Sequence, residues 1–158
     1  MARGRDPRWL TEPQQRAWRA YLHGGRLLMD VLDHDLSEHG LQLSEYEIVS
    51  MLSEAPGTQM RMSELADLVV QSRSRLTHTA SRLERRGWVT REPCPDDRRG
   101  VLLTLTEAGR DQVRRLAPIH LASVRARLVD VLTPAQFAAL GEAMSVVSEH
   151  LGHPTSTA

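Results

Sequence analysis

The sequence contains no lysine, so all 20 of its basic residues are arginine. Schiff-base chemistry and the lysine-dependent phosphate-binding loop are therefore excluded. Its single cysteine, Cys94, excludes an intrachain disulfide bond and a CxxC metal or redox site. The longest uncharged stretch inside the expected fold, residues 131–141, is far shorter than the roughly 20 residues that span a bilayer. We therefore expect no membrane span.

Hydrophobic residues form 41% and charged residues 25% of the 158 residues, which predicts a folded domain rather than a disordered or fibrous chain. Residues 1–8 carry three arginines, but no apolar block follows, so we expect no secretory signal and a cytoplasmic protein. The net charge is zero, yet residues 71–91 contain six arginines and one acidic residue. This local excess of positive charge is typical of a nucleic-acid contact.

Helical periodicity dominates both ends of the chain. Apolar residues recur every three to four positions from Trp18 to Leu36, and the predicted helix ends near Gly40. Thr106 is expected to cap a long helix that Pro118 kinks, because proline lacks an amide donor. Thr133-Pro134 predicts the start of a last helix.

Shorter helices are predicted between these ends. Residues 44–47, Ser-Glu-Tyr-Glu, have the pattern of a capping box that begins one of them. Ser63 is expected to cap a short third helix, and Ser72 a fourth over about residues 73–86. Gly87 suits the left-handed conformation that ends a helix.

After Gly87 the pattern changes to two strand-like runs, residues 88–91 and 101–105. Residues 92–100 contain two prolines and are expected to form the loop of a hairpin. The order of helices followed by a hairpin and further helices is that of a winged helix-turn-helix with flanking helices. We therefore predict a mainly α fold with a small β-wing.

Three motifs resemble the MarR family of bacterial transcription regulators. They are Met-Ser-Glu-Leu-Ala at 62–66, the helix that ends in Leu-Glu-Arg-Arg-Gly-Trp-Val at 83–89, and Asp-Arg-Arg at 97–99 leading into Leu-Thr-Leu-Thr-Glu-Ala-Gly at 103–109. The resemblance covers about residues 18–151.

This resemblance implies a single MarR-type domain over residues 1–158. Its winged helix-turn-helix would be residues 44–106, between dimerisation helices at 10–40 and 107–151. It also implies a homodimer, double-stranded DNA as the partner, and a small-molecule or oxidant signal.

The predicted fourth helix is the candidate DNA-reading element. Leu76, Ala80 and Leu83 recur at spacings of four and three and are expected to pack inward. Side chains on the opposite face can bind base edges or phosphates, and the candidates are Arg73, Ser74, Arg75, Thr77, His78, Ser81, Arg82 and Arg85. We expect base contacts from Arg73, Ser74, Thr77 and His78. Phosphate contacts or stabilisation of the helix C-terminus are expected from Arg82, Arg85 and Arg86. The alternative to DNA contact, for any single arginine, is that it simply lies on a solvated face of the helix.

Asp97, Arg98 and Arg99 complete the candidate DNA-binding set at the wing tip. An arginine there suits the negative potential of a narrow A·T-rich minor groove, and Asp97 is expected to hold its guanidinium by a bidentate pair. The alternative is a salt bridge within the turn. The resemblance matches Asp97 to the family's wing aspartate and one of the two arginines to its minor-groove probe.

The terminal helices carry apolar stripes larger than a winged helix of about 60 residues can cover. A symmetric dimer would cover them and would place two recognition helices roughly 34 Å apart, which predicts a pseudo-palindromic operator. The alternative is that these helices fold back on their own chain.

Three further residues bear on how a signal is sensed. Cys94 lies between prolines and is expected to be inert, although the charge of a neighbouring arginine would favour its oxidisable thiolate form. His34 and Glu38 share a helix face, but no HxxxH pair accompanies them, so we predict no metal site. His120 lies near Pro118 and either belongs to a ligand pocket or is an interior histidine with satisfied hydrogen bonds.

No GxSxG, HExxH, glycine-rich dinucleotide turn or alternating βαβ pattern is present, so neither an enzyme nor a cofactor is predicted. A winged-helix module that binds protein is the alternative class, but it would lack outward arginines on the fourth helix and wing. A redox- or metal-responsive variant is the other alternative. We predict a homodimeric, sequence-specific DNA-binding repressor that a small molecule releases.

Overall fold

The chain forms a winged helix-turn-helix between long helices. The computed structural model describes residues 9–95 and 97–152, without the side chain of Arg98. In chain order the elements are α1 (Glu12–Ser37), α2 (Leu43–Glu54), η1 (Pro56–Thr58), β1 (Gln59–Arg61), α3 (Met62–Leu68), α4 (Arg73–Arg85), β2 (Val89–Cys94), β3 (Asp97–Leu105), α5 (Glu107–Val124), the π-helical turn η2 (Arg125–Val129) and α6 (Pro134–His150).

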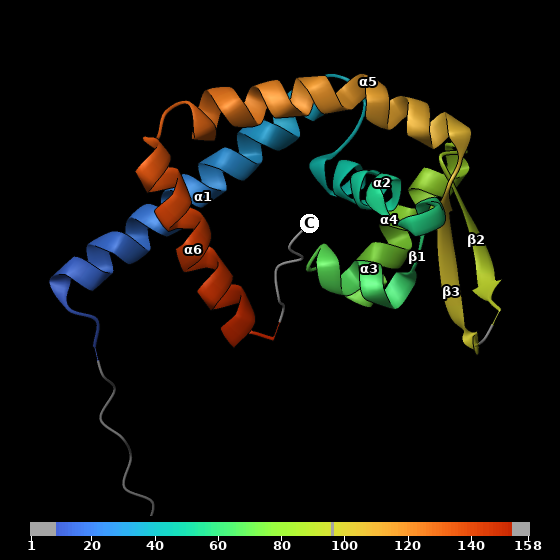
Figure 1. Ribbon diagram of the computed structural model, residues 1–158, viewed down its shortest axis with the longest axis horizontal. Helices are drawn as coiled ribbons and strands as arrows, with labels where there is room; N and C mark the ends of the chain where they lie inside the picture. Colours follow the sequence, from blue (N-terminus) through green and yellow to red (C-terminus); the bar gives the residue numbers. More distant parts are fainter. Residues whose placement is uncertain (1–8, 96, 153–158) are drawn as a thin grey trace, which may run out of the picture.

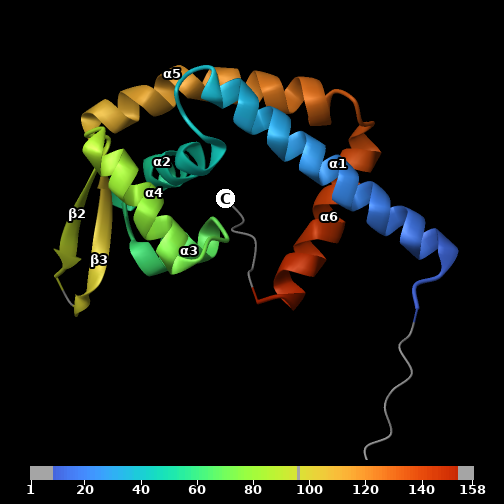
Figure 2. The ribbon, with the colours of Figure 1, turned by 180° about the vertical axis from the view of Figure 1, so that it is seen from behind.

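Two parts are visible in the ribbon. α2, α3, α4 and the strands form a unit at one end, whereas α1 and α6 extend away at the other end (Figure 1). α5 runs along one side of both parts, as the reverse view also shows (Figure 2). The predicted fold class, mainly α with a small β-wing, is confirmed. Within the described ranges, no helix is both long enough and apolar enough to cross a membrane.

The sheet has the antiparallel order β1-β3-β2. β1 is absent from the sequence prediction, because a three-residue strand is too short to show a periodic pattern. It pairs with β3, and Met60 lies opposite Leu103. β1 therefore joins the start of the helix-turn-helix directly to the wing.

The wing strands are longer than predicted. β2 continues to Cys94 and β3 begins at Asp97, so most of the predicted loop at 92–100 belongs to the sheet. Pro93 pairs with Val101 because β2 is an edge strand, where the missing amide donor of proline faces no partner strand.

The buried core is built from α1 to α5 and the sheet. Leu76, Ala80 and Leu83, predicted to face inward, are at most 1% exposed. Their core neighbours include Leu36, Ile48, Leu52, Leu65, Leu103 and Leu116. α6 contributes no buried residue.

Two predicted helix starts are wrong by one or two residues. Residues 44–47 are not the capping box of α2, because the amide of Gln42 donates to the Glu45 carboxylate at 3.0 Å and the helix begins at Leu43. Ser63 lies inside α3, since β1 leads directly into that helix. The other predicted caps are confirmed, and they are Ser72, Thr106 and Thr133.

Pro118 does not interrupt α5. The helix continues from Glu107 to Val124 as one ribbon (Figure 1). The departure from α geometry comes later, at the π-helical turn η2. Pro118 therefore lies inside one continuous helix, and the kink expected there stays a prediction.

The turn between α3 and α4 holds Val70 in the left-handed region, with φ +50°. This conformation is costly for a β-branched side chain, and Val70 is 72% exposed, so it gains little from packing. We expect Val70→Gly to raise the free energy of unfolding by about 1 kcal/mol in urea denaturation. Val69→Gly is the matched control, because Val69 has φ −86° and packs against the core, and it should lower stability. A lower free energy of unfolding in both variants would contradict backbone strain at Val70.

Candidate nucleic-acid interface

Ser72 determines where α4 begins. Its hydroxyl oxygen accepts a hydrogen bond from the amide of Arg75 at 3.2 Å. The face turned toward the core carries Leu76, Ala80 and Leu83 together with the buried Thr79. The opposite face of α4 is therefore left to solvent.

That outward face is polar. Six residues of the candidate DNA-binding set are exposed on it, and they are Arg73, Ser74, Arg75, Thr77, His78 and Arg85. The hydroxyl of Thr77 donates to the Arg73 carbonyl at 2.8 Å, and that of the half-buried Ser81 donates to the Thr77 carbonyl at 2.9 Å. Because both hydroxyl protons are engaged, these oxygens present acceptors, which suit the amino groups of adenine or cytosine.

A groove of about 390 Å³ lies between α4, the start of α3 and the wing. Arg73 and Thr77 line it from α4, and Arg99 lines it from β3. Arg61 of β1 joins them, although it is missing from the sequence-predicted set. The only feature of the sequence that could have identified Arg61 as a candidate is its position just before the helix-turn-helix. The structure thus brings α4 and the wing together at one groove.

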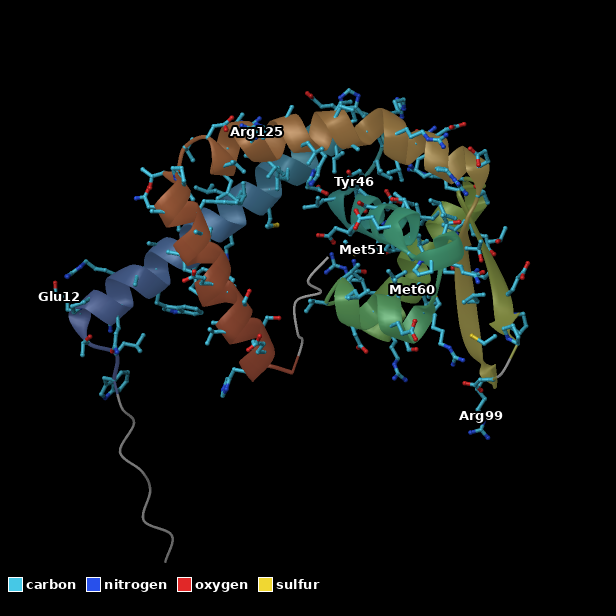
Figure 3. All side chains as sticks on the ribbon, viewed as in Figure 1. Glu12, Tyr46, Met51, Met60, Arg99 and Arg125 are labelled. Atoms are coloured by element: carbon cyan, nitrogen blue, oxygen red, sulfur yellow. The ribbon has the colours of Figure 1, made fainter. Side chains whose placement is uncertain are left out.

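Asp97 has two partners among the described residues. One carboxylate oxygen accepts from the backbone amide of Arg99 at 3.0 Å, and the other lies 3.8 Å from Nη1 of Arg61. Asp97 therefore shapes the hairpin turn instead of holding the Arg99 side chain. Arg99 is exposed and projects from the wing tip (Figure 3). The side chain of Arg98 lies outside the described part of the chain.

Arg82 is attached to α2. Its Nη2 donates to Oε1 of Gln42 at 2.6 Å, and its Nε lies 3.2 Å from a Glu45 carboxylate oxygen. Glu45 is 2% exposed, so its charge needs this partner. These contacts anchor α4 to α2, and the phosphate contact or helix-end stabilisation expected of Arg82 stays a prediction.

Two more arginines of residues 71–91 make internal contacts. Arg86 donates to the Gly40 carbonyl at 2.7 Å and lies 4.9 Å from the centre of the Trp88 ring. Arg91 pairs with Glu84, with Nε 2.9 Å from the carboxylate, and this hydrogen bond lowers the pKa of Glu84. The exposed arginines left for an outside partner are therefore Arg73 and Arg75 at the start of α4 and Arg85 at its end.

The predicted sensor residues have ordinary surroundings. Cys94 is 3% exposed, which agrees with an inert, buried thiol. His34 lies 3.8 Å from Glu38 on an exposed face. In the described part of the chain, no group of three metal-ligating side chains comes together.

His120 lines a second cavity, of about 540 Å³, between α1, α2 and α5. Its ring centre is 4.6 Å from that of Tyr46, and Figure 3 shows Tyr46 on α2. Burial lowers the pKa of His120, so the imidazole is uncharged. Its Nδ1 is buried and has no hydrogen-bond partner among the described residues.

Comparison with known proteins gives consistent results. A model of the MarR family matches residues 39–100. AbsC, a MarR family transcriptional regulator from Streptomyces coelicolor, is 46% identical; the match covers 92% of this chain and 98% of AbsC, with a TM-score of 0.86. Sco3205, a MarR family transcriptional regulator from the same organism solved in complex with DNA, is 44% identical; the match covers 92% of each chain, with a TM-score of 0.88. The transcriptional repressor MprA of Escherichia coli (strain K12) is 29% identical over 100 residues, which are 63% of this chain and 57% of MprA.

These similarities extend beyond the winged helix to the flanking helices, because the two Streptomyces structures match nearly the whole chain. All three of these relatives are transcriptional regulators. The chain therefore belongs to the MarR family of transcriptional regulators.

Proposed function

We propose that the protein is a homodimeric transcriptional repressor that binds a pseudo-palindromic DNA operator and is released by a small molecule. The observation that carries DNA binding is the groove at which Arg73 and Thr77 of α4 meet Arg61 and Arg99 of the sheet. A helix of this kind fits the major groove, and a neighbouring wing reaches phosphates or the minor groove. The DNA complex of the relative Sco3205 supports this proposal.

The roles of individual residues follow from their exposure. Arg73, Ser74, Thr77 and His78 read base edges, because they occupy the exposed first turns of α4. Arg75 and Arg85 flank them and contact phosphates, whereas the hydroxyl oxygen of Ser81 is left as an acceptor for base amino groups. Arg61 and the wing residues Arg98 and Arg99 bind the backbone or the minor groove, with Asp97 holding the turn.

Apolar side chains on α1 and α6 support a dimer. On α6, Phe137, Leu140 and Val147 are exposed, and their spacing places them on one helix face. On α1, Trp18 and Tyr21 stack with their ring centres 5.9 Å apart, and each is about half exposed. A second copy that covers these faces removes apolar area from water, which the chain alone leaves exposed.

Release by a small molecule is proposed from the cavity that His120 lines. The cavity lies where α1 and α5, which lead to the proposed dimer contacts, meet α2, which anchors α4 through Glu45 and Arg82. A ligand that binds better when the two recognition helices are wrongly spaced shifts the population away from the DNA-competent form.

Selection of binding sites from random duplex DNA tests the proposal. We expect the purified protein to enrich an inverted repeat whose half-site centres are about 10 base pairs apart, with binding that weakens as salt increases. No enrichment at low salt would contradict DNA recognition and favour the protein-binding module.

The double variant Thr77→Ala, His78→Ala is the matched test of base reading. It should lose about tenfold or more of its preference for the selected repeat while its affinity for random duplex changes little. Arg115→Ala, on the exposed surface of α5, is the control and should keep the preference. An equal loss on both kinds of DNA would contradict a role of these two residues in base reading.

A further inference from the structure

The cavity at His120 has an apolar body. Helices α1, α2 and α5 contribute aliphatic and thioether side chains, among them Met29, Leu32, Leu43, Met51, Val113 and Leu121. A volume of about 540 Å³ lies within the usual range of small-molecule sites. The cavity therefore suits an organic molecule with a hydrophobic body, such as a bicyclic ring.

The charged side chains that line this cavity are both carboxylates, Glu47 and Glu54 of α2. Among the described residues, no arginine lines it. Arg75 interacts electrostatically with Glu47, and both residues line a neighbouring pocket. Burial raises the pKa of Glu47, and the charge of Arg75 only partly opposes this effect. A negative ligand group would meet like charge here, whereas a positive one would stabilise a desolvated carboxylate.

His120 supplies the second polar contact. Its imidazole is uncharged and so has one nitrogen that accepts a hydrogen bond. The buried Nδ1 has no partner in the described structure, and a buried polar atom without one is costly. In the tautomer whose proton lies on Nε2, Nδ1 accepts. An N–H of an ammonium group is then a favourable partner, because hydrogen bonds from a charged donor are stronger than those from a neutral one.

We propose that the effector is a lipophilic amine, bound as its ammonium ion between Glu47, Glu54 and His120 with its hydrophobic body among the aliphatic side chains of α1 and α5. This inference rests on the proposed control by a small molecule and names its chemical class. Aromatic carboxylic acids are disfavoured by the same two carboxylates.

Three ligands of one shape test the charge preference. Isothermal titration calorimetry of the full-length protein should compare 2-naphthylmethylamine, 2-naphthylmethanol and 2-naphthoic acid. We expect the amine to bind most tightly, the alcohol less tightly and the acid least tightly. We expect the amine to bind at least about tenfold more tightly than the acid. Equal or tighter binding of the acid, or no binding of any of the three, would overturn the proposal.

Matched variants locate the binding site. Glu47→Gln keeps the shape of the side chain and should weaken amine binding about tenfold while leaving the alcohol unchanged. His120→Phe keeps a ring beside Tyr46 and should lower the affinity for the amine, because it removes the acceptor nitrogen. Glu64→Gln on the exposed start of α3 is the control and should bind the amine as the parent protein does. Unchanged amine affinity in Glu47→Gln, with circular dichroism showing an intact fold, would overturn the assignment.

The DNA assay separates this inference from the proposed function. If the amine binds in the predicted order but leaves the protein on its selected DNA, the ligand class is supported and the proposed release fails. If the acid alone binds and releases DNA, the proposed release stands and the ligand class is overturned.

Discussion

Replacing Gly109 by alanine is expected to lower the free energy of unfolding by about 3 kcal/mol, because the added methyl group would overlap atoms that cannot easily move. A Cβ at this position would overlap the carbonyl oxygen of Trp88 and lie 2.7 Å from Cδ1 of Leu105. The same carbonyl accepts the Thr106 amide at 3.0 Å, so moving α5 away would break this hydrogen bond. Urea or thermal denaturation measures the loss.

Gly24→Ala is the matched control for Gly109→Ala. Gly24 lies inside α1, and a Cβ there meets no atom within 4 Å. This variant should raise the free energy of unfolding by up to about 1 kcal/mol, because alanine favours a helix more than glycine does. If Gly109→Ala behaves like Gly24→Ala, the close packing of α5 on the turn at Trp88 is refuted.

The double variant Phe137→Glu, Leu140→Glu is expected to convert the proposed dimer to a monomer and to weaken binding to the selected two-half-site DNA at least about 100-fold. Both side chains are partly exposed on one face of α6, so charges there would be buried without partners in the proposed interface. Light scattering after size exclusion should change from twice 17.8 kDa to 17.8 kDa.

Val146→Glu provides the control for this dimer test. Val146 is 67% exposed, and the helical period places it on the side of α6 opposite to Phe137. The control should remain dimeric and keep its DNA affinity. Because α6 contributes no buried residue, the monomeric double variant should keep its fold by circular dichroism. A double variant that stays dimeric would refute an interface on this face of α6.

Local sequence patterns predicted most of the helices correctly for physical reasons. Ser72, Thr106 and Thr133 each combine a capping side chain with a following helical pattern, and both features depend only on near neighbours. Gly87 has the predicted positive φ for the same reason. Strand β1 was missed, because three residues gain their extended conformation from pairing with β3, a partner more than 40 positions away.

The candidate DNA surface was likewise predicted in part from the sequence. The spacing of Leu76, Ala80 and Leu83 predicted which face of α4 is buried, and therefore that Arg73 and Thr77 are exposed. Sequence spacing did not show that Arg82 is held by Glu45, because the two residues are 37 positions apart and meet only when α4 packs on α2. It also did not show that Asp97 lies beside Arg61, because that approach requires the sheet.

The amino-acid sequence by itself determined the family motifs, the order of the helices and the face of α4 that is left to solvent, because these depend on composition and on short-range periodicity. Only the tertiary structure decided which arginines remain available to a partner and which are held by Glu45, Glu84 or Gly40. It also decided that Glu47 and His120, far apart in the sequence, line one cavity between α1, α2 and α5. Charges and hydrogen bonds between distant residues form only when the helices pack, so no local pattern specifies them.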